Sequence, residues 1–401
     1  MNPSLRSLHR WRMLRGSYLW MPISFLYLSR RLDIGTVLDL EALYYLSVVV
    51  LEVPSGWVSD RAGRVRTLRA SSLLLAGALA LFLMGDNNVG LFALAQITLA
   101  ASFAASSGTD IAFHADHLES EGTLAELGDR EARFGRDGSL ARVVGSLTGG
   151  ALALIDLRVA YTAALALAVL EFVALWPARE SSQELSTQAF LPQVSESLRH
   201  LRDPILGWTF AYVVVQLTTE HLPAQFSQPY LAEVLGADTA DLAATPLVSG
   251  IMVACLALVA AWGSARSIVF ARRWGTVTVL LGVGAVEIVL LLAMAAVVHP
   301  LILVLLLGRA LQPSMGNVLV AHIVAPRIDA RLRATHLSVA SLAGRGGFGI
   351  VLLGLGRVAD GSLGEPGALR APLIVATIIG AVGLAALAVT RGAVSAIDVE
   401  T

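Results

Sequence analysis

Ionisable side chains interrupt the long apolar runs of this sequence, and the chemistry open to such residues is the binding and release of protons. The residues concerned are Glu52, Asp110, Glu171, Glu220, Glu287, Arg309 and Arg345. An ionisable group is costly inside a helix that lies in lipid, so each one is a candidate functional residue. Burial in a low-dielectric site favours the neutral form of a carboxyl group, which can then exchange protons near neutral pH. Glu52, Asp110 and Glu220 are therefore the candidates for proton coupling.

Asp110 has a histidine close to it on the expected helix. His114 follows Asp110 by four residues, so both side chains lie on one helix face and could relay a proton. Two other interpretations stay open. Asp110, His114 and His117 could bind a divalent metal ion, or Asp110 could instead bond to the region of Arg61 or Arg142. No established metal-ligand spacing stands out, so we expect no metal.

Glu220 and Arg309 lie in two different apolar runs, and both are candidates for a binding cavity. At about 1.5 Å per residue, their heights in the bilayer differ by about 8 Å, which long side chains can partly bridge. A purely structural ion pair is the alternative. Glu287 and Arg345 are expected to form a structural pair, and Glu171 has no assigned role.

The composition excludes most soluble functions. Of the 401 residues, 56% are hydrophobic and 15% are charged, and the mean hydropathy is +0.70. Soluble domains carry about 25% charged residues. No nucleophile–base pair, metal-ligand spacing or phosphate-binding loop stands out, so we expect neither an enzyme nor a cofactor. A nucleic-acid partner is not expected either, because the net charge is −1 and no basic face stands out.

Twelve stretches have the length and apolar composition that cross a bilayer as helices. They span residues 14–31, 38–58, 68–86, 89–112, 138–156, 159–176, 204–226, 242–262, 275–297, 300–324, 334–357 and 371–390.

The basic residues orient these spans. All 29 of them are arginines. If the N-terminus is cytoplasmic and the spans alternate, 22 arginines fall on the cytoplasmic side and 5 on the outer side. This split follows the positive-inside rule, and it predicts that both termini are cytoplasmic. The N-terminus has no short apolar core followed by a cleavage site, so we expect it to be retained.

The polar stretch 177–203 divides the twelve spans equally. We expect residues 1–176 and 204–401 to form two six-helix bundles and 177–203 to form a cytoplasmic linker between them. Glycines recur in the fifth span of each half, at Gly145 and Gly149 and again at Gly347. Small residues let helices approach closely in lipid. The predicted fold is therefore an all-α integral membrane protein with twelve transmembrane helices in two pseudo-symmetric bundles.

The loop between the second and third spans carries the most specific motif. It reads Gly56-Trp57-Val58-Ser59-Asp60-Arg61-Ala62-Gly63-Arg64-Val65-Arg66 and resembles the signature loop of the major facilitator superfamily, G-x-x-x-D-R-x-G-R-x-R. Gly63 permits a tight turn with positive φ, and Gly56 would let a neighbouring helix pack beside the acid. The resemblance implies that Gly56, Asp60, Arg61, Gly63 and Arg64 form a gating loop. A topogenic basic loop with a structural aspartate is the alternative.

Further stretches resemble a bacterial drug-exporter-like branch of that superfamily. They are Glu52-Val53-Pro54-Ser55-Gly56, Ser106 to Asp110 with Asp116, and Gln228-Pro229-Tyr230-Leu231. The chain departs from this pattern in two respects. Its fourth span lacks the central arginine that many proton-coupled members carry, and its fifth span has no proline after the first glycine pair, which weakens the match to the antiporter signature. The resemblance also implies that spans one, four, seven and ten line a central cavity. Their polar candidates for binding a substrate are Tyr18, Gln96, Gln216, Glu220, Arg309, Gln312 and Asn317.

These features together predict a monomeric secondary active transporter in a bacterial cytoplasmic (inner) membrane. Alternating access and proton-coupled efflux of a hydrophobic or amphipathic small molecule are expected, as in drug-resistance antiporters. Uptake or facilitated diffusion of a metabolite is one alternative. A non-transporting membrane receptor or scaffold on a transporter fold is another.

Overall fold

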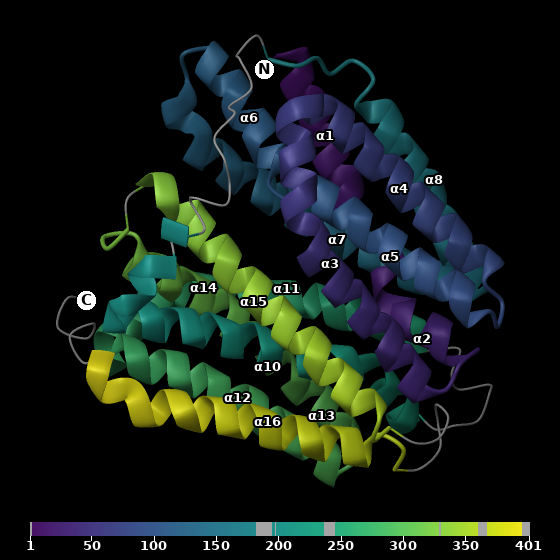
Figure 1. Cartoon of the computed structure of the whole chain (residues 1–401). Coiled ribbons are helices and arrows are strands. Elements are labelled where there is room, and N and C mark those ends of the chain that lie inside the picture. The colour runs from purple at the N-terminus through teal and green to yellow at the C-terminus, as the bar shows by residue number, and fades with distance from the viewer. Residues whose placement is uncertain are drawn as a thin grey trace. The chain divides into compact units, whose positions relative to one another are not determined.

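The computed structural model describes residues 2–181, 195, 196, 198–235, 245–328, 330–359 and 367–394. These residues form helices and turns, and none of them lies in a strand (Figure 1). Among them, nine segments are long and apolar enough to cross a membrane. The predicted spans 138–156 and 204–226 also coincide with helices, which carry more polar residues, and the predicted span 14–31 covers the end of the helix Pro3–Gly16 and the short helices Met21–Ile23 and Ser24–Ser29. The all-α prediction is therefore confirmed, and the twelve predicted spans agree with the helices in place.

The helices of the first half begin near the N-terminus. They are α1 (Pro3–Gly16), η1 (Met21–Ile23), α2 (Ser24–Ser29), α3 (Ile34–Ala62), α4 (Arg64–Met84), α5 (Val89–Ser106), α6 (Thr109–Ser120), η2 (Leu124–Glu126), α7 (Leu127–Ala153) and α8 (Leu157–Ala174).

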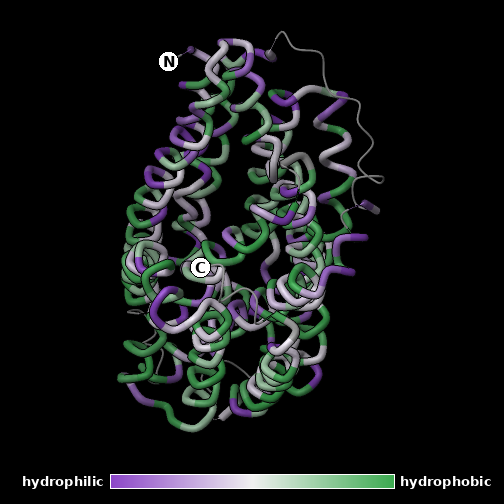
Figure 2. The backbone as a smooth tube through the Cα atoms, turned by 90° about the vertical axis from the view of Figure 1, so that its left-hand side faces the viewer, coloured by the Kyte–Doolittle hydropathy of each residue, from purple (hydrophilic) through white to green (hydrophobic). Residues whose placement is uncertain are grey.

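The helices of the second half follow the linker. They are η3 (His200–Arg202), α10 (Pro204–Leu235), α11 (Thr245–Trp274), α12 (Thr276–Ala296), α13 (Pro300–Leu305), η5 (Leu306–Ala310), α14 (Leu311–Val324), α15 (Ala330–Gly356), α16 (Arg370–Thr390) and η6 (Arg391–Val394). Figure 2 shows hydrophobic residues along the helices of both halves.

The chain groups into two compact units. Unit 1 comprises Met1–Leu32, Leu43–Gln188 and Pro246–Ala254, and unit 2 comprises Asp33–Ala42, Ala189–Thr245 and Cys255–Thr401. The start of α3 thus belongs to unit 2, and the start of α11 belongs to unit 1. The sequence boundaries 1–176, 177–203 and 204–401 stay a prediction.

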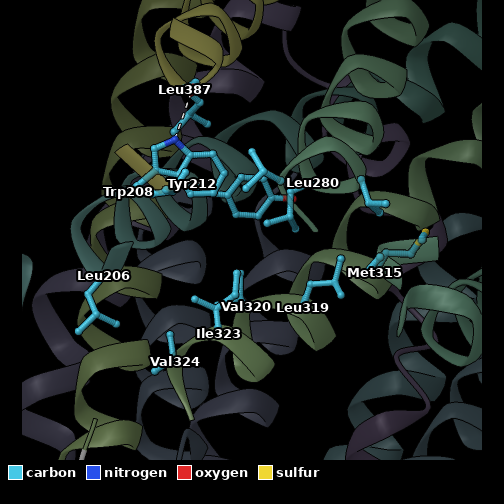
Figure 3. Close-up of a cluster of buried hydrophobic side chains, with 14 of the residues drawn as sticks. Leu206, Trp208, Tyr212, Leu280, Met315, Leu319, Val320, Ile323, Val324 and Leu387 are labelled. Carbon is cyan, nitrogen blue, oxygen red and sulfur yellow. Dashed lines mark hydrogen bonds between the residues drawn. The ribbon is translucent and has the colours of Figure 1, made fainter. Parts of the chain in front are cut away.

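Each unit has its own hydrophobic core. In unit 1, Leu8, Trp11, Leu68 and Phe113 pack in one buried cluster. In unit 2, the buried side chains of α10, α12 and α14 form another cluster, which includes the labelled residues of Figure 3. There the indole Nε1 of Trp208 donates to the carbonyl oxygen of Leu387 at 3.1 Å. This bond satisfies the one polar atom of an otherwise apolar side chain, as a buried tryptophan requires.

The same glycine turn joins two helices in each half. Gly63 links α3 to α4 with φ 102°, and Gly275 links α11 to α12 with φ 85°. Residues with a Cβ rarely adopt this conformation, so glycine is required at both turns. The recurrence between the second and third spans of each half agrees with the predicted duplication.

Three of the four spans predicted to line a cavity are interrupted, and the fourth contains two prolines. The first span breaks between α1 and η1, the fourth at Ser107–Gly108, and the tenth runs through the 3₁₀ segment η5. The seventh, α10, contains Pro223 and Pro229. Transporters commonly build their sites from such discontinuous helices, because freed backbone groups there can face a polar cavity.

The predicted start of the first span is wrong. The helix begins at Pro3, not near residue 14, because the side chain of Asn2 caps it by accepting the Ser4 N–H at 2.9 Å. It ends at Gly16, and Tyr18 then adopts φ 44°. A Cβ at Gly145 or Gly149 of α7 would collide with the carbonyl oxygens of Ser17 and Leu19. The glycine pair therefore permits close packing, as predicted, and its neighbour is this break.

Candidate functional site

The signature loop holds its acid and its arginine together. Asp60, near the end of α3, pairs with Arg64, the first residue of α4. The Arg64 guanidinium also donates to Ser59 Oγ at 3.1 Å and approaches Asp116 of α6 at 3.5 Å. Arg61 stacks over the ring of Trp57 at 4.1 Å instead of joining this cluster. Asp60, Arg64 and Asp116 thus link the α3–α4 turn to α6.

No described atom of unit 1 lies within 4 Å of the position that a Cβ would occupy on Gly56. The predicted close packing of a neighbouring helix beside Gly56 stays a prediction. Glu52, one turn earlier, accepts a hydrogen bond from Ser107 Oγ at 2.9 Å. This bond places the predicted coupling residue Glu52 beside the break between α5 and α6.

Asp110 does not pair with Arg61 or Arg142. Its carboxylate lies 2.8 Å from Nε of Arg12, on α1. Arg142 instead lies over the ring of Tyr18, 5.3 Å from its centroid. Sequence reasoning missed Arg12 because the first span was predicted to begin near residue 14, whereas Arg12 lies on α1, which begins at Pro3.

His114 and Asp110 are joined through α7 and α1. Nδ1 of His114 bonds to Glu131 of α7, and the ring stacks on Phe134 at 4.8 Å. Glu131 also accepts from Arg12 at 2.9 Å. His117 Nδ1 instead bonds to the carbonyl oxygen of Phe113 at 3.0 Å. The described residues therefore give no support to a metal site at Asp110, His114 and His117.

Glu131 lies on α7 before its apolar stretch, and its ionisation makes the folding stability depend on pH. Burial acts to raise the pKa of Glu131, but the hydrogen bond with His114 and the charge of Arg12 outweigh it and hold the pKa below its ordinary value. The ionised form of Glu131 therefore stabilises the fold at pH values above the ordinary pKa of glutamate. This contribution is lost as the pH falls through the lowered folded-state pKa.

We expect Glu131→Gln to lower Tm near pH 7. At acidic pH, the Tm of the variant should lie closer to that of the wild type. The two Tm curves should converge as the pH falls through the lowered folded-state pKa of Glu131, because the wild-type carboxyl also becomes neutral there. Thermal unfolding of the purified protein across this pH range measures the difference. A Tm difference that stays constant with pH would contradict the assignment.

Sequence reasoning also missed a buried ion pair in unit 1. Arg15 of α1 lies 3.2 Å from the carboxylate of Glu171 on α8. Glu171 is 2% exposed. Arg15 donates to Ser102 Oγ at 2.7 Å and to Ser106 Oγ at 3.2 Å, and Ser72 donates to Glu171 at 3.4 Å. The signal was present, since Glu171 is the single charged residue of the sixth predicted span and Arg15 lies in the first.

Several predicted cavity residues come together in unit 2. Nε2 of Gln216 lies 3.1 Å both from the Glu220 carboxylate and from Asn317 Oδ1. Thr219 Oγ1 donates to Gln312 Oε1 at 3.1 Å. Gly316 makes this approach of α14 to α10 possible, because a Cβ there would collide with Gln216 Oε1. The remaining candidates Gln96 and Tyr18 lie in unit 1, where Gln96 is buried.

Arg309 lies near two acids. It interacts electrostatically with Glu287 and with Glu220, but no ion pair within 4 Å joins it to either of these described residues. Glu287 is fully buried, and neither carboxylate oxygen has a hydrogen-bond partner among the described residues. The predicted pair of Glu287 and Arg345 is wrong, because the charge of Arg345 acts on Glu220 and His221 instead.

Long apolar helices, interrupted spans and buried charges define a multi-pass membrane protein of the transporter class. The sequence matches the Major Facilitator Superfamily over residues 13–351. The chain therefore belongs to this superfamily and is a transporter of that fold rather than an enzyme. A search of curated proteins found no match.

Solved structures share this fold over nearly the whole chain. The nucleoside transporter NupG superposes with a TM-score of 0.74 at 14% identity, covering 96% of this chain and 99% of that one. A POT family peptide transporter gives a TM-score of 0.74 at 14% identity, covering 98% and 97%. A D-xylose–proton symporter gives 0.71 at 14% identity, covering 96% of each chain. Likeness at these identities establishes the fold alone.

Proposed function

We propose that this chain is a proton-coupled secondary transporter that exports a hydrophobic or amphipathic small molecule by alternating access. In this proposal it acts as a monomer in a bacterial cytoplasmic membrane, with both termini in the cytoplasm. The arginine split between the two sides supports the orientation. The drug-exporter-like stretches around Glu52, Asp110 and Pro229 support the direction.

The observation that carries the proposal is the environment of Glu220. Its side chain is 13% exposed, it accepts a hydrogen bond from Gln216, and the charges of Arg309 and Arg345 act on it. Protonation of Glu220 removes a negative charge on which both arginines act. A change of this kind shifts a conformational equilibrium by the difference in proton affinity between the two states.

The polar groups around Glu220 suit a substrate with few charges. Gln216, Gln312 and Asn317 offer amides, which orient a ligand without demanding a full charge from it. In the proposal, these side chains bind the substrate, and the signature loop around Asp60 controls access. Asp110 and His114 are the second candidates for proton coupling. Their side chains belong to a network of two acids, Asp110 and Glu131, with Arg12 and a histidine.

We expect Glu220→Gln to uncouple transport from the proton gradient. The amide keeps the shape of the carboxyl group but cannot bind a proton, so efflux should become insensitive to an imposed pH gradient. A thermal-shift screen of a compound panel at two pH values first identifies a ligand. Efflux of that compound from proteoliposomes, with and without the gradient, then measures the coupling.

Glu233→Gln is the matched control for this experiment. It makes the same chemical change on the same helix, where Glu233 accepts a hydrogen bond from the Gly367 N–H. Gradient-driven efflux should persist in this control. A Glu220→Gln protein that still follows the gradient would refute proton coupling at Glu220, and accumulation in the opposite direction would favour the uptake alternative.

A further inference from the structure

The chain that follows α8 returns to the signature loop. Oε1 of Glu180 accepts a hydrogen bond from the backbone N–H of Val65 at 2.9 Å, across 115 positions of sequence. Ser181 Oγ donates to the carbonyl oxygen of Asp116 at 3.1 Å. The guanidinium of Arg69 donates to the carbonyl oxygens of Leu175 and Trp176, each at 3.0 Å. The first residues of the predicted linker are therefore bonded to α4 and α6, within unit 1.

Glu180 supplies a helix cap that the loop itself cannot supply. The first N–H groups of a helix lack partners within the helix, and an N-cap side chain usually accepts one of them. The N-cap of α4 is Gly63, which has no side chain, and the turn requires that glycine because its φ is 102°. Val65 is the second residue of α4, so its N–H is one that a cap normally binds. The Glu180 carboxylate takes this place.

Gly63 also makes room for the carboxylate. A Cβ built on Gly63 would collide with Oε1 of Glu180 and would lie 2.9 Å from its Cδ. The glycine of the motif therefore has two roles. It permits the backbone turn, and it leaves the space in which an acid from the linker can reach the start of α4.

The capped turn holds the arginine of the gate. Arg64 is the first residue of α4, and its guanidinium bridges Asp60 and Asp116. A negative charge at a helix N-terminus is favourable, so Glu180 stabilises the turn from which Arg64 extends. Ser181 binds the backbone of the same Asp116. The linker thus bonds to the first turn of α4, which carries Arg64, and to the backbone of Asp116.

We propose that Glu180 is a positioning residue of the signature loop. Through the start of α4, Glu180 holds Arg64 between Asp60 and Asp116, so that the linker and the loop change their conformations together. The inference rests on the gating function proposed for the loop. The geometry requires no particular substrate or transport direction.

Hydrogen exchange tests the contact in the full-length protein in lipid nanodiscs. The Val65 amide is protected by Glu180 rather than by its own helix, so Glu180→Ala should speed exchange in residues 64–68 about fivefold. Glu180→Gln keeps an oxygen acceptor and should stay within about twofold of the wild type. Glu119→Ala, at an exposed acid on α6, is the control and should leave this segment unchanged. Unchanged exchange in Glu180→Ala, or an equal rise in the control, would overturn the proposal.

A double-mutant cycle tests the shared space at Gly63. Gly63→Ala should lower Tm through both backbone strain and the collision with Glu180, and the second cost disappears when Glu180 is also alanine. The two substitutions should therefore lower Tm by less together than the sum of their separate effects. Additive effects would contradict the inference. If Asp60→Asn leaves transport intact, the gating function fails, whereas failure of the exchange and cycle tests refutes only the role of Glu180.

Discussion

Replacing Asp60 by Asn should slow transport by at least about tenfold, or about 1.4 kcal/mol of barrier, while leaving ligand binding intact. Asparagine has the same shape, but it removes the charge that pairs with Arg64. Arg64 would keep only Ser59 at 3.1 Å and the more distant Asp116. If the loop stabilises one of two access states, loss of the pair disturbs the balance between them. Asp60 is not one of the residues proposed to bind the substrate, so thermal-shift binding should persist.

Folding should respond much less than transport to Asp60→Asn. The Asp60 side chain is 38% exposed, and exposed ion pairs contribute about 0.2–1 kcal/mol. Asp129→Asn is a suitable control, since it makes the same change at an exposed acid in the first turn of α7. Efflux from proteoliposomes should be normal in this control. A wild-type rate in Asp60→Asn would remove the gating function from the loop.

Replacing Glu171 by Ala should destabilise the protein by about 3–5 kcal/mol, because it leaves a buried charge without its partner. Glu171 is 2% exposed and Arg15 is 12% exposed at the side chain, so water cannot replace the lost carboxylate. The remaining acceptors of Arg15 are Ser102 and Ser106, which are uncharged. Denaturant unfolding of the purified protein measures the loss.

The double variant Arg15→Met with Glu171→Leu separates lost charge from lost packing. Removing both charges leaves no uncompensated ion, and buried pairs replaced by apolar residues of similar size are often no less stable. Most of the stability should therefore return. A double variant as unstable as Glu171→Ala would show that Arg15 does not depend on Glu171.

The positions of most spans were predictable, but the interruptions and the start of the first helix were not. Apolar stretches of about 20 residues located α4, α8 and α12 to within a few residues. The break at Gly108 was read as part of a continuous span, because the residues on both sides are apolar or small. It arises from a single left-handed residue, with φ 73°, and window-averaged hydropathy carries no information on one backbone angle.

The site could be predicted within helices and not between them. Gln216 and Glu220 were both predicted cavity residues of the seventh span; they lie one helical turn apart, and the structure joins them. The partner of Asp110 depended on how α1 rotates against α6, which periodicity does not specify. The same limit explains the wrong pairing of Glu287 with Arg345, since the orientation of η5 brings Arg309 nearer to Glu287.

The 3₁₀ winding of η5 gives the tenth span an adjustable pitch. A 3₁₀ segment advances about 2.0 Å and turns about 120° per residue, whereas an α-helix advances about 1.5 Å and turns about 100°. The five residues Leu306–Ala310 are wound in this tighter form. Rewinding them as α-helix would shorten the span by about 2.5 Å and twist α14 against α13 by about 100°. Arg309 lies within this segment, so such a screw motion would change which of its two acids it faces.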